Sequence, residues 1–155
     1  TRDSTLRKMN QEQWVDVINT DLTSVFYMTR MVVNDMLANG YGRIINISSV
    51  NGEKGQFGQA NYSAAKAGMH GFTKAVAQEV ASKGVTVNTI SPGYIATPMI
   101  MEVPEEIREG IRKNIPVGRF GKPEDIARVV SFLAHEDASF ITGTNVSANG
   151  GQYMH

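Results

Sequence analysis

The sequence contains no cysteine at all. Disulfide bonds and thiolate metal sites are therefore excluded, and the composition suits a reducing compartment, so we expect a cytoplasmic protein. Charge of neither sign prevails, because 15 Lys and Arg balance 15 Asp and Glu. Nucleic-acid binding needs a clustered basic face, so we expect no nucleic-acid partner. No apolar run reaches the roughly 18 residues of a membrane-spanning helix, and we expect no membrane span.

Motifs for metal binding and for acyl transfer are also lacking. The three histidines, His70, His135 and His155, are scattered, and none has another His, Cys or Glu at the spacing of a metal site. No G-x-S-x-G motif marks an activated serine. We therefore expect no metal and no acyl-transfer serine.

Helical and strand-like patterns alternate along the 155 residues. Apolar residues spaced by three and four predict a long helix over 11–39, which Asn39-Gly40 would end. Further helices are predicted over 60–83 and 122–137, and a mobile helical insert over 99–116. The apolar stripe of the first helix would consist of Trp14, Ile18, Leu22, Val25, Met28 and Val32. Short strands are predicted over 42–49, 84–91 and 143–151, and a Gly-rich loop over 50–59.

Strands separated by helices predict parallel crossovers, with helices covering both faces of the sheet. The expected fold class is therefore α/β, as the C-terminal part of a doubly wound, Rossmann-like parallel sheet. Three strands are half of the about six that such a domain has, and no G-x-G-x-x-G motif follows an opening strand. We expect residues 1–155 to form a single, incomplete dinucleotide-binding and catalytic domain without its Gly-rich N-terminal half. A naturally truncated product is the alternative.

Tyr62 and Lys66 lie four residues apart in the second long helix, so they share one helix face. A nearby ammonium favours the phenolate and lowers the tyrosine pKa from its usual value near 10. A tyrosine tuned in this way can donate a proton to a carbonyl oxygen. An ordinary pair on a solvated helix face is the alternative.

Polar and turn residues follow the first two predicted strands, at the carboxyl ends where parallel sheets bind ligands. Ser49 follows the first strand, and its hydroxyl could hold the same carbonyl oxygen as Tyr62. Pro92-Gly93 follows the second strand, where its backbone could line a flat ring. A helix cap for Ser49 and a simple strand stop for Pro92-Gly93 are the alternatives.

Ser49, Tyr62-Ser63-Ala64-Ala65-Lys66, Pro92-Gly93 and Thr97 together resemble the motifs of the classical short-chain dehydrogenases/reductases, over essentially the whole chain. The resemblance implies an oxidoreductase that acts on CH–OH groups, with NADPH or else NADH as cofactor. Tyr62 would donate the proton, Lys66 would lower its pKa and hold the cofactor ribose, and Ser49 would bind the substrate oxygen. The cofactor-binding residues implied are Tyr62, Lys66, Pro92, Gly93, Ile95 and Thr97.

The segments "NISSVNGEKGQFGQANYSAAKAG" and "SPGYIATPM" carry a finer resemblance, to reductases of short 3-oxoacyl-CoA thioesters, with acyl-carrier-protein reductases close behind. It implies a thioester substrate of either carrier and a homo-oligomer, dimer or tetramer, built on helices 11–39 and 60–83. An inactive fragment or an oligomerisation module is the remaining alternative. The substrate-binding residues implied are Asp3, Gln56, Phe57, Gln59 and Tyr94, for which ordinary loop packing is the alternative.

Asp21 stands where the resembled family usually has a catalytic Asn. An aspartate accepts hydrogen bonds from water but cannot donate them through an amide. Its negative charge beside Lys66 would also blunt the effect of the ammonium on Tyr62. We therefore expect slower or pH-shifted turnover, since Asn19 lies at the wrong helical phase to replace the missing amide.

Overall fold

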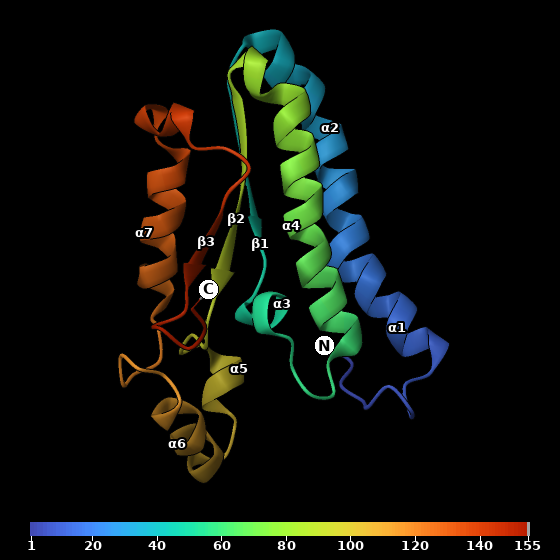
Figure 1. The fold of residues 1–155 in the computed structure, drawn as a ribbon, viewed down its shortest axis with the longest axis vertical. Coiled ribbons are helices and arrows are strands. Elements are labelled where there is room, and N and C mark those ends of the chain that lie inside the picture. The colour runs from blue at the N-terminus through green and yellow to red at the C-terminus, as the bar shows by residue number, and fades with distance from the viewer. Residues whose placement is uncertain (155) are drawn as a thin grey trace.

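The computed structural model describes residues 1–154, and His155 lies outside the described residues. Within that range, the strands form one parallel sheet in the order β1–β2–β3 (Figure 1). The strands are β1 (Gly42–Ile47), β2 (Val85–Pro92) and β3 (Asn145–Ala148). The helices are α1 (Gln11–Ile18), α2 (Ser24–Asn39), α3 (Val50–Lys54), α4 (Ala60–Val80), α5 (Pro98–Met101), α6 (Glu105–Lys113) and α7 (Pro123–Ala134). Three shorter turns are the π-helical η1 (Asn19–Thr23) and the 3₁₀ turns η2 (Ala81–Lys83) and η3 (Glu136–Phe140).

The sheet lies between two helical layers, which confirms the predicted α/β class. Helices α2 and α4 cover one face, and α7 lies on the other (Figure 1). Strand β2 runs through the middle and is buried from Val85 to Ser91, as its β-branched sequence favours. Ile44 of β1 packs with Val85 and Val87 of β2 and with Ala77 of α4 in the main apolar cluster.

Strand β1 departs from the expectation that helices cover both of its faces. Gly42, Ile44 and Asn46 are buried, whereas Arg43 and Ile45 are half-exposed and Ile47 is exposed. Strand β1 pairs with β2 along one edge, and it forms the other edge of the described sheet. The described part of the chain therefore covers one face of β1 well and the other incompletely.

The predicted helix over 11–39 is interrupted by the π-helical turn η1. The Ser24 amide donates to the carbonyl of Asn19, five residues earlier, and the extra residue rotates the rest of the helix by about 100°. After the turn, the buried position is therefore Thr29 and not the predicted Met28, which is exposed. Before the turn, Trp14 of the predicted stripe is also exposed and Val17 is buried, a departure that the turn does not explain. The predicted stop is confirmed: Gly40 ends α2 in the left-handed conformation.

The segment predicted as a Gly-rich loop contains a short helix, α3. Ser49 forms its N-cap, because the Ser49 Oγ accepts a hydrogen bond of 3.1 Å from the Asn51 amide. Gly52 explains how α3 packs against α4: a Cβ there would lie 2.8 Å from the Lys66 Cβ. The glycine that suggested a loop instead permits a close helix contact.

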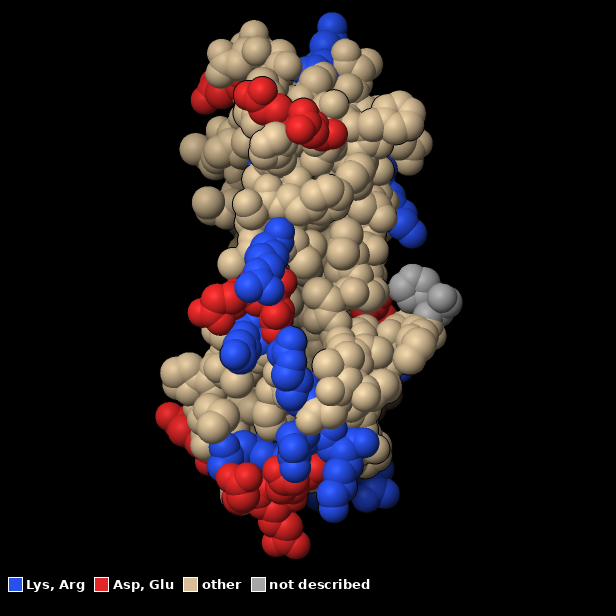
Figure 2. Space-filling view, turned by 90° about the vertical axis from the view of Figure 1, so that its left-hand side faces the viewer, with Lys and Arg blue, Asp and Glu red and all other residues tan. Residues whose placement is uncertain are grey.

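The remaining helices match their predictions closely. Pro123 begins α7, and the insert forms α5 and α6. Charged side chains of both signs gather over α6, at the lower end of the face seen in Figure 2. Ion pairs Glu105–Arg108 and Glu109–Arg112 span adjacent turns of α6. Among the described helices, none combines the length and apolar character needed to cross a bilayer.

Candidate active site

A cleft of about 300 Å³ opens at the carboxyl ends of β1 and β2. It lies where the motifs after the two strands meet, together with the start of α4. Its lining includes Ser49, Val50, Asn51, Gln59, Tyr62, Gly93, Tyr94, Ile95, Thr97, Met99 and Ile100. The structure therefore brings together most of the residues that the sequence singled out, from segments far apart in the chain.

Ser49 and Tyr62 face each other across this cleft. The Ser49 hydroxyl lies beside the Tyr62 phenol, and its interaction with the phenol oxygen lowers the pKa of Tyr62. Ser49 caps α3 through its Oγ, which confirms the cap considered from the sequence, and it also lies beside Tyr62, where its binding of a substrate oxygen stays a prediction. The hydroxyl and the phenol together offer two O–H donors to a single oxygen atom in the cleft.

The pKa of Tyr62 is raised above its usual value. Burial of the half-buried phenol is the largest cause, and the carboxylates of Asp21 and Asp3 add to it, whereas the hydrogen bond from Ser49 lowers the pKa. The expectation that Lys66 acidifies this phenol is therefore wrong for this structure. At neutral pH the phenol stays protonated and can act as a proton donor.

Lys66 is held by partners other than the phenol oxygen. Its Nζ lies 3.3 Å from the Asp21 Oδ1, and it donates a 3.1 Å hydrogen bond to the Ile47 carbonyl. Both members of the ion pair are largely buried, with side chains 12% and 22% exposed. The Lys66 Nζ lies 5.5 Å from the centre of the Tyr62 ring. Asp21 thus neutralises the ammonium, as its charge led us to expect.

The π-helical turn explains how Asp21 reaches Lys66. Turn η1 packs against α4, and the Leu22 side chain lies so close to Gly68 that a Cβ there would come within 2.7 Å of it. Asn19 instead accepts a hydrogen bond from Thr23 within the same turn. Asn19 therefore does not replace the amide, as the helical phase predicted, and π turns of this kind are frequent at functional sites.

A chain of amide contacts connects the cleft to the N-terminal segment. Gln59 donates a 2.8 Å hydrogen bond to the Asp3 carboxylate, and Asn51 donates one of 3.0 Å to the Gln59 Oε1. Because a carboxylate only accepts, the Gln59 amide must present its nitrogen to Asp3 and its oxygen to Asn51. Gln59 lines the cleft and holds Asp3 beside it, and the substrate-binding role of both residues stays a prediction.

Gly93, Ile95 and Thr97 follow β2 and form one wall of the cleft. Gly93 is required here for a close approach: a Cβ would lie 2.8 Å from the Asn149 Cα. The Thr97 amide donates a 2.7 Å hydrogen bond to the Ile95 carbonyl, which turns the chain into α5. The fourth residue implied with them, Pro92, ends β2.

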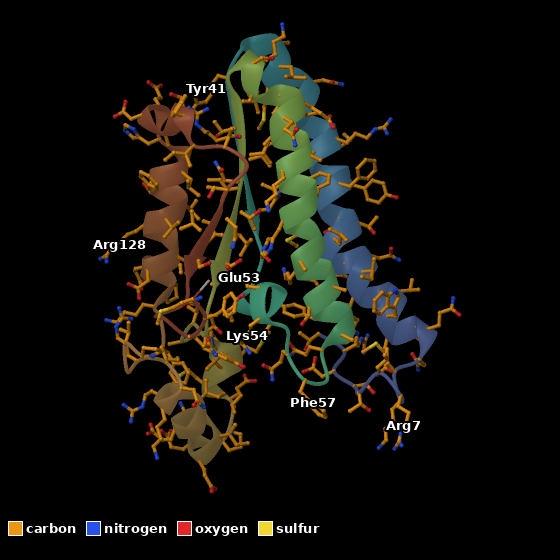
Figure 3. The ribbon with its side chains drawn as sticks, viewed as in Figure 1. Arg7, Tyr41, Glu53, Lys54, Phe57 and Arg128 are labelled. Carbon is orange, nitrogen blue, oxygen red and sulfur yellow. The ribbon has the colours of Figure 1, made fainter. Side chains whose placement is uncertain are left out.

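The implied substrate residues divide between the cleft and its surroundings. Tyr94 lines both the cleft and a neighbouring pocket of about 490 Å³, which Gln56 also lines. The Gln56 Oε1 accepts a 2.8 Å hydrogen bond from the Lys54 Nζ. Phe57 is 88% exposed and points away from α4 at the loop tip (Figure 3). Its role as a substrate contact stays a prediction.

Asn61 is a site residue that sequence reasoning missed. It is fully buried, and its Nδ2 donates to the carbonyls of Arg2 and Gln13 while its Oδ1 accepts from the Tyr62 amide. It thereby fixes the start of α4 against α1 and the N-terminal segment. Its place directly before Tyr62 was the available signal, but one polar residue in a helical pattern predicts nothing specific.

No group of three or more His, Asp or Glu side chains within residues 1–154 is arranged to hold a metal ion. The chemistry that the described site can perform is proton transfer and hydrogen bonding to one oxygen atom, beside a cleft with a partly apolar wall.

Comparison with known proteins extends this description. A family model described as "Enoyl-(Acyl carrier protein) reductase" matches residues 2–153. The chain is 58% identical to an acetoacetyl-CoA reductase of Allochromatium vinosum, covering 100% of this chain and 63% of the relative. It is 60% identical to an acetoacetyl-CoA reductase of Rhizobium meliloti, covering 99% of this chain and 64% of the relative. It is 49% identical to a 3-oxoacyl-[acyl-carrier-protein] reductase of Haemophilus influenzae, also covering 99% of this chain and 64% of the relative. The chain thus spans less than two thirds of each of these relatives.

Proposed function

Because the chain belongs to the short-chain dehydrogenase/reductase family, we propose that it reduces the 3-keto group of a short 3-oxoacyl-CoA to the 3-hydroxyacyl-CoA, with NADPH as reductant. The cofactor supplies a hydride to C3 when bound. The single observation that carries the proposal is the meeting of Ser49 and Tyr62 at the cleft, with Lys66 one helical turn away.

Tyr62 performs the proton transfer in this reaction. Its phenol is protonated at neutral pH and donates its proton to the alkoxide oxygen that forms as C3 is reduced. Ser49 donates a hydrogen bond to the same oxygen and afterwards stabilises the phenolate, since its hydrogen bond lowers the pKa of Tyr62. The raised pKa keeps the phenol protonated but makes release of its proton harder, so we expect slow turnover at neutral pH.

The residues of the site fit the nicotinamide end of a dinucleotide. The Lys66 ammonium carries three N–H donors, and among the described residues Ile47 and Asp21 take two of them, which leaves one for a ribose hydroxyl. Gly93 and Ile95 offer backbone and an aliphatic side chain to a flat ring on the cleft wall. Together with Tyr62, Pro92 and Thr97, these residues would hold the cofactor.

Replacing Tyr62 by Phe tests the proposed function. The variant keeps the ring and removes only the acidic oxygen, so the kcat for reduction of acetoacetyl-CoA should fall about 100-fold or more. Tyr41→Phe, in the exposed connection between α2 and β1, is the matched control and should behave like the parent. Equal rates for parent and Tyr62→Phe would refute the mechanism.

A second substrate is favoured by the relatives named as acyl-carrier-protein reductases. Comparing kcat/KM for acetoacetyl-CoA and for the matching carrier-protein thioester separates the two assignments.

NADPH binding, followed by fluorescence, separates an enzyme from an inert oligomerisation module. Saturable binding that Lys66→Ala weakens would support the proposal, and its absence would favour the inert module.

A further inference from the structure

Helix α3 is too short to hold its own position. It has five residues, and an isolated helix of that length does not persist in water. Ser49 is the N-cap of α3, so the position of its hydroxyl depends on the contacts that hold α3 in place. Gly52 packs closely on the α4 backbone and fixes one side of α3. A Cβ added to Gly52 would lie only 2.9 Å from the Lys66 carbonyl carbon.

Glu53 holds a second side of α3. Its Oε1 accepts a 2.8 Å hydrogen bond from the Asn145 Nδ2 and another from the Ser147 hydroxyl, both on β3 (Figure 3). The carboxylate thus joins two elements that lie more than 90 residues apart in the chain. Charged acceptors form the stronger class of hydrogen bonds, and this one is partly buried.

The contact continues under the cleft to the other catalytic helix. The Ser91 Oγ donates a 2.8 Å hydrogen bond to the Asn145 Oδ1, and the His70 Nε2 lies 3.3 Å from the Ser91 Oγ. The same nitrogen lies 3.0 Å from the Ser48 Oγ, which donates to the Lys66 carbonyl at 2.8 Å. A relay of side chains therefore joins Glu53 on α3 to the backbone of α4 at Lys66.

The hydrogen bonds of Ser48 and Ser91 determine which nitrogen of His70 carries a hydrogen. Ser48 and Ser91 each have one hydroxyl hydrogen, and the contacts to Lys66 and Asn145 use both. The His70 Nε2 must therefore carry a hydrogen and donate it to these two oxygens. Burial lowers the pKa of His70, which favours this neutral form at pH 7.

We propose that Glu53 is a positioning residue, which clasps α3 to β3 so that Ser49 stays within hydrogen-bonding reach of Tyr62. The hydrogen bonds through Ser91 and His70 hold α4, and with it Tyr62, at a fixed distance from β3. Glu53 touches neither substrate nor cofactor in this role. The inference rests on the proposed function only in treating the Ser49–Tyr62 contact as the reacting pair.

Truncating Glu53 tests the clasp through the phenol itself. In Glu53→Ala, Ser49 loses its fixed place and its hydrogen bond no longer lowers the pKa of Tyr62. The pKa should rise, with about a threefold to tenfold smaller phenolate fraction at a given alkaline pH. Phenolate absorbance of the purified protein, minus that of the Tyr62→Phe background, measures it without any turnover. The kcat should fall about tenfold with an unchanged KM for NADPH.

The sign of the pKa change separates positioning from charge. Deleting a nearby negative charge would by itself lower the pKa of Tyr62, whereas displacing Ser49 raises it. The Asp21 and Asp3 carboxylates, which also act on this phenol, stay in place. A lowered or unchanged pKa in folded Glu53→Ala would overturn the proposal.

Two milder variants and a control complete the test. Glu53→Gln keeps an acceptor oxygen for Asn145 and Ser147 and should restore most of the parent titration. Ser147→Ala removes one donor only and should raise the pKa of Tyr62 less, and it decides the matter if Glu53→Ala does not fold. Glu136→Ala, exposed in the turn η3, should change nothing. A parent that titrates as expected but reduces no 3-oxoacyl thioester would refute the proposed function and leave the clasp standing.

Discussion

Lys66 and Asp21 define the electrostatics of the site at the scale of single residues. An unpaired ammonium near Tyr62 would favour the phenolate, but the 3.3 Å ion pair with Asp21 cancels most of that field. Asp21 in turn adds to the forces that raise the pKa of Tyr62. The aspartate therefore opposes ionisation of the phenol.

Replacing Asp21 by Asn should reverse this effect. The variant removes the negative charge while keeping a side chain of the same size, so the pKa of Tyr62 falls toward its usual value. The phenolate needed for the reverse reaction, oxidation of a 3-hydroxyacyl thioester, should then form at lower pH, and its kcat near pH 7 should rise by about threefold to tenfold. Steady-state kinetics across the pH range in both directions measures the change.

A matched control accompanies this variant. Asp35→Asn makes the same chemical change on the exposed face of α2 and should leave the pH profile unchanged. An Asp21→Asn profile that overlays the parent profile would show that Asp21 does not act on the phenol.

Local spacing made part of the site predictable at this scale. Tyr62 and Lys66 share a helix face because of their i,i+4 spacing, and Ser49 follows a β-branched run. Asn61 and His70 could not be found in this way, because their partners lie far away in the sequence or on another element. The raised pKa of Tyr62 was missed because it depends mainly on burial, which no spacing reveals.

At the scale of elements, two segments of the chain did not follow their sequence pattern. The π turn at 19–23 shifts the part of the apolar stripe that follows it by one residue, because a 3.6-residue period cannot anticipate an inserted residue. Helix α3 was missed because Gly52 within it and Gly55 just after it are typical of loops. In both cases tertiary contacts with α4 override the local preference, and both segments carry or flank a site residue.

Adding a methyl group to Gly52 should displace α3. The new Cβ would lie 2.8 Å from the Lys66 Cβ and 2.9 Å from its carbonyl carbon, so the two helices must separate. Overpacking of this kind costs about 1–3 kcal/mol of unfolding free energy. Urea unfolding of Gly52→Ala measures the loss, and the kcat should fall with it, because Ser49 moves with α3.

Gly71 offers a control in which the same substitution should raise the unfolding free energy. It lies inside α4 with no atom within 4 Å of a hypothetical Cβ, so Gly71→Ala should gain about 0.5–1 kcal/mol from helix propensity. A Gly52→Ala protein as stable as the parent would show that α3 adapts its position without cost.

For the whole molecule, the distribution of apolar surface bears on assembly. Helix α2 exposes Tyr27, Met28 and Met31, the last with 76% of its surface in solvent. Beside them, a groove of about 510 Å³ runs between α2 and α4, lined by Phe26, Val33 and Phe72 among others. A large exposed apolar patch is often a site of protein–protein contact.

We expect this face of α2 and α4 to join two copies of the chain. A charge placed at its centre would have to be buried without a partner, so Met31→Glu should weaken the association constant at least about 100-fold, the equivalent of roughly 3 kcal/mol. Sedimentation of the purified protein over a range of concentrations should show a dimer or tetramer for the parent and smaller species for the variant.

Ile107→Glu, on the exposed side of α6, makes the same change away from this face and should sediment like the parent. A parent that sediments as a monomer at every concentration would contradict the expectation, and the apolar face of α2 and α4 would then need another partner.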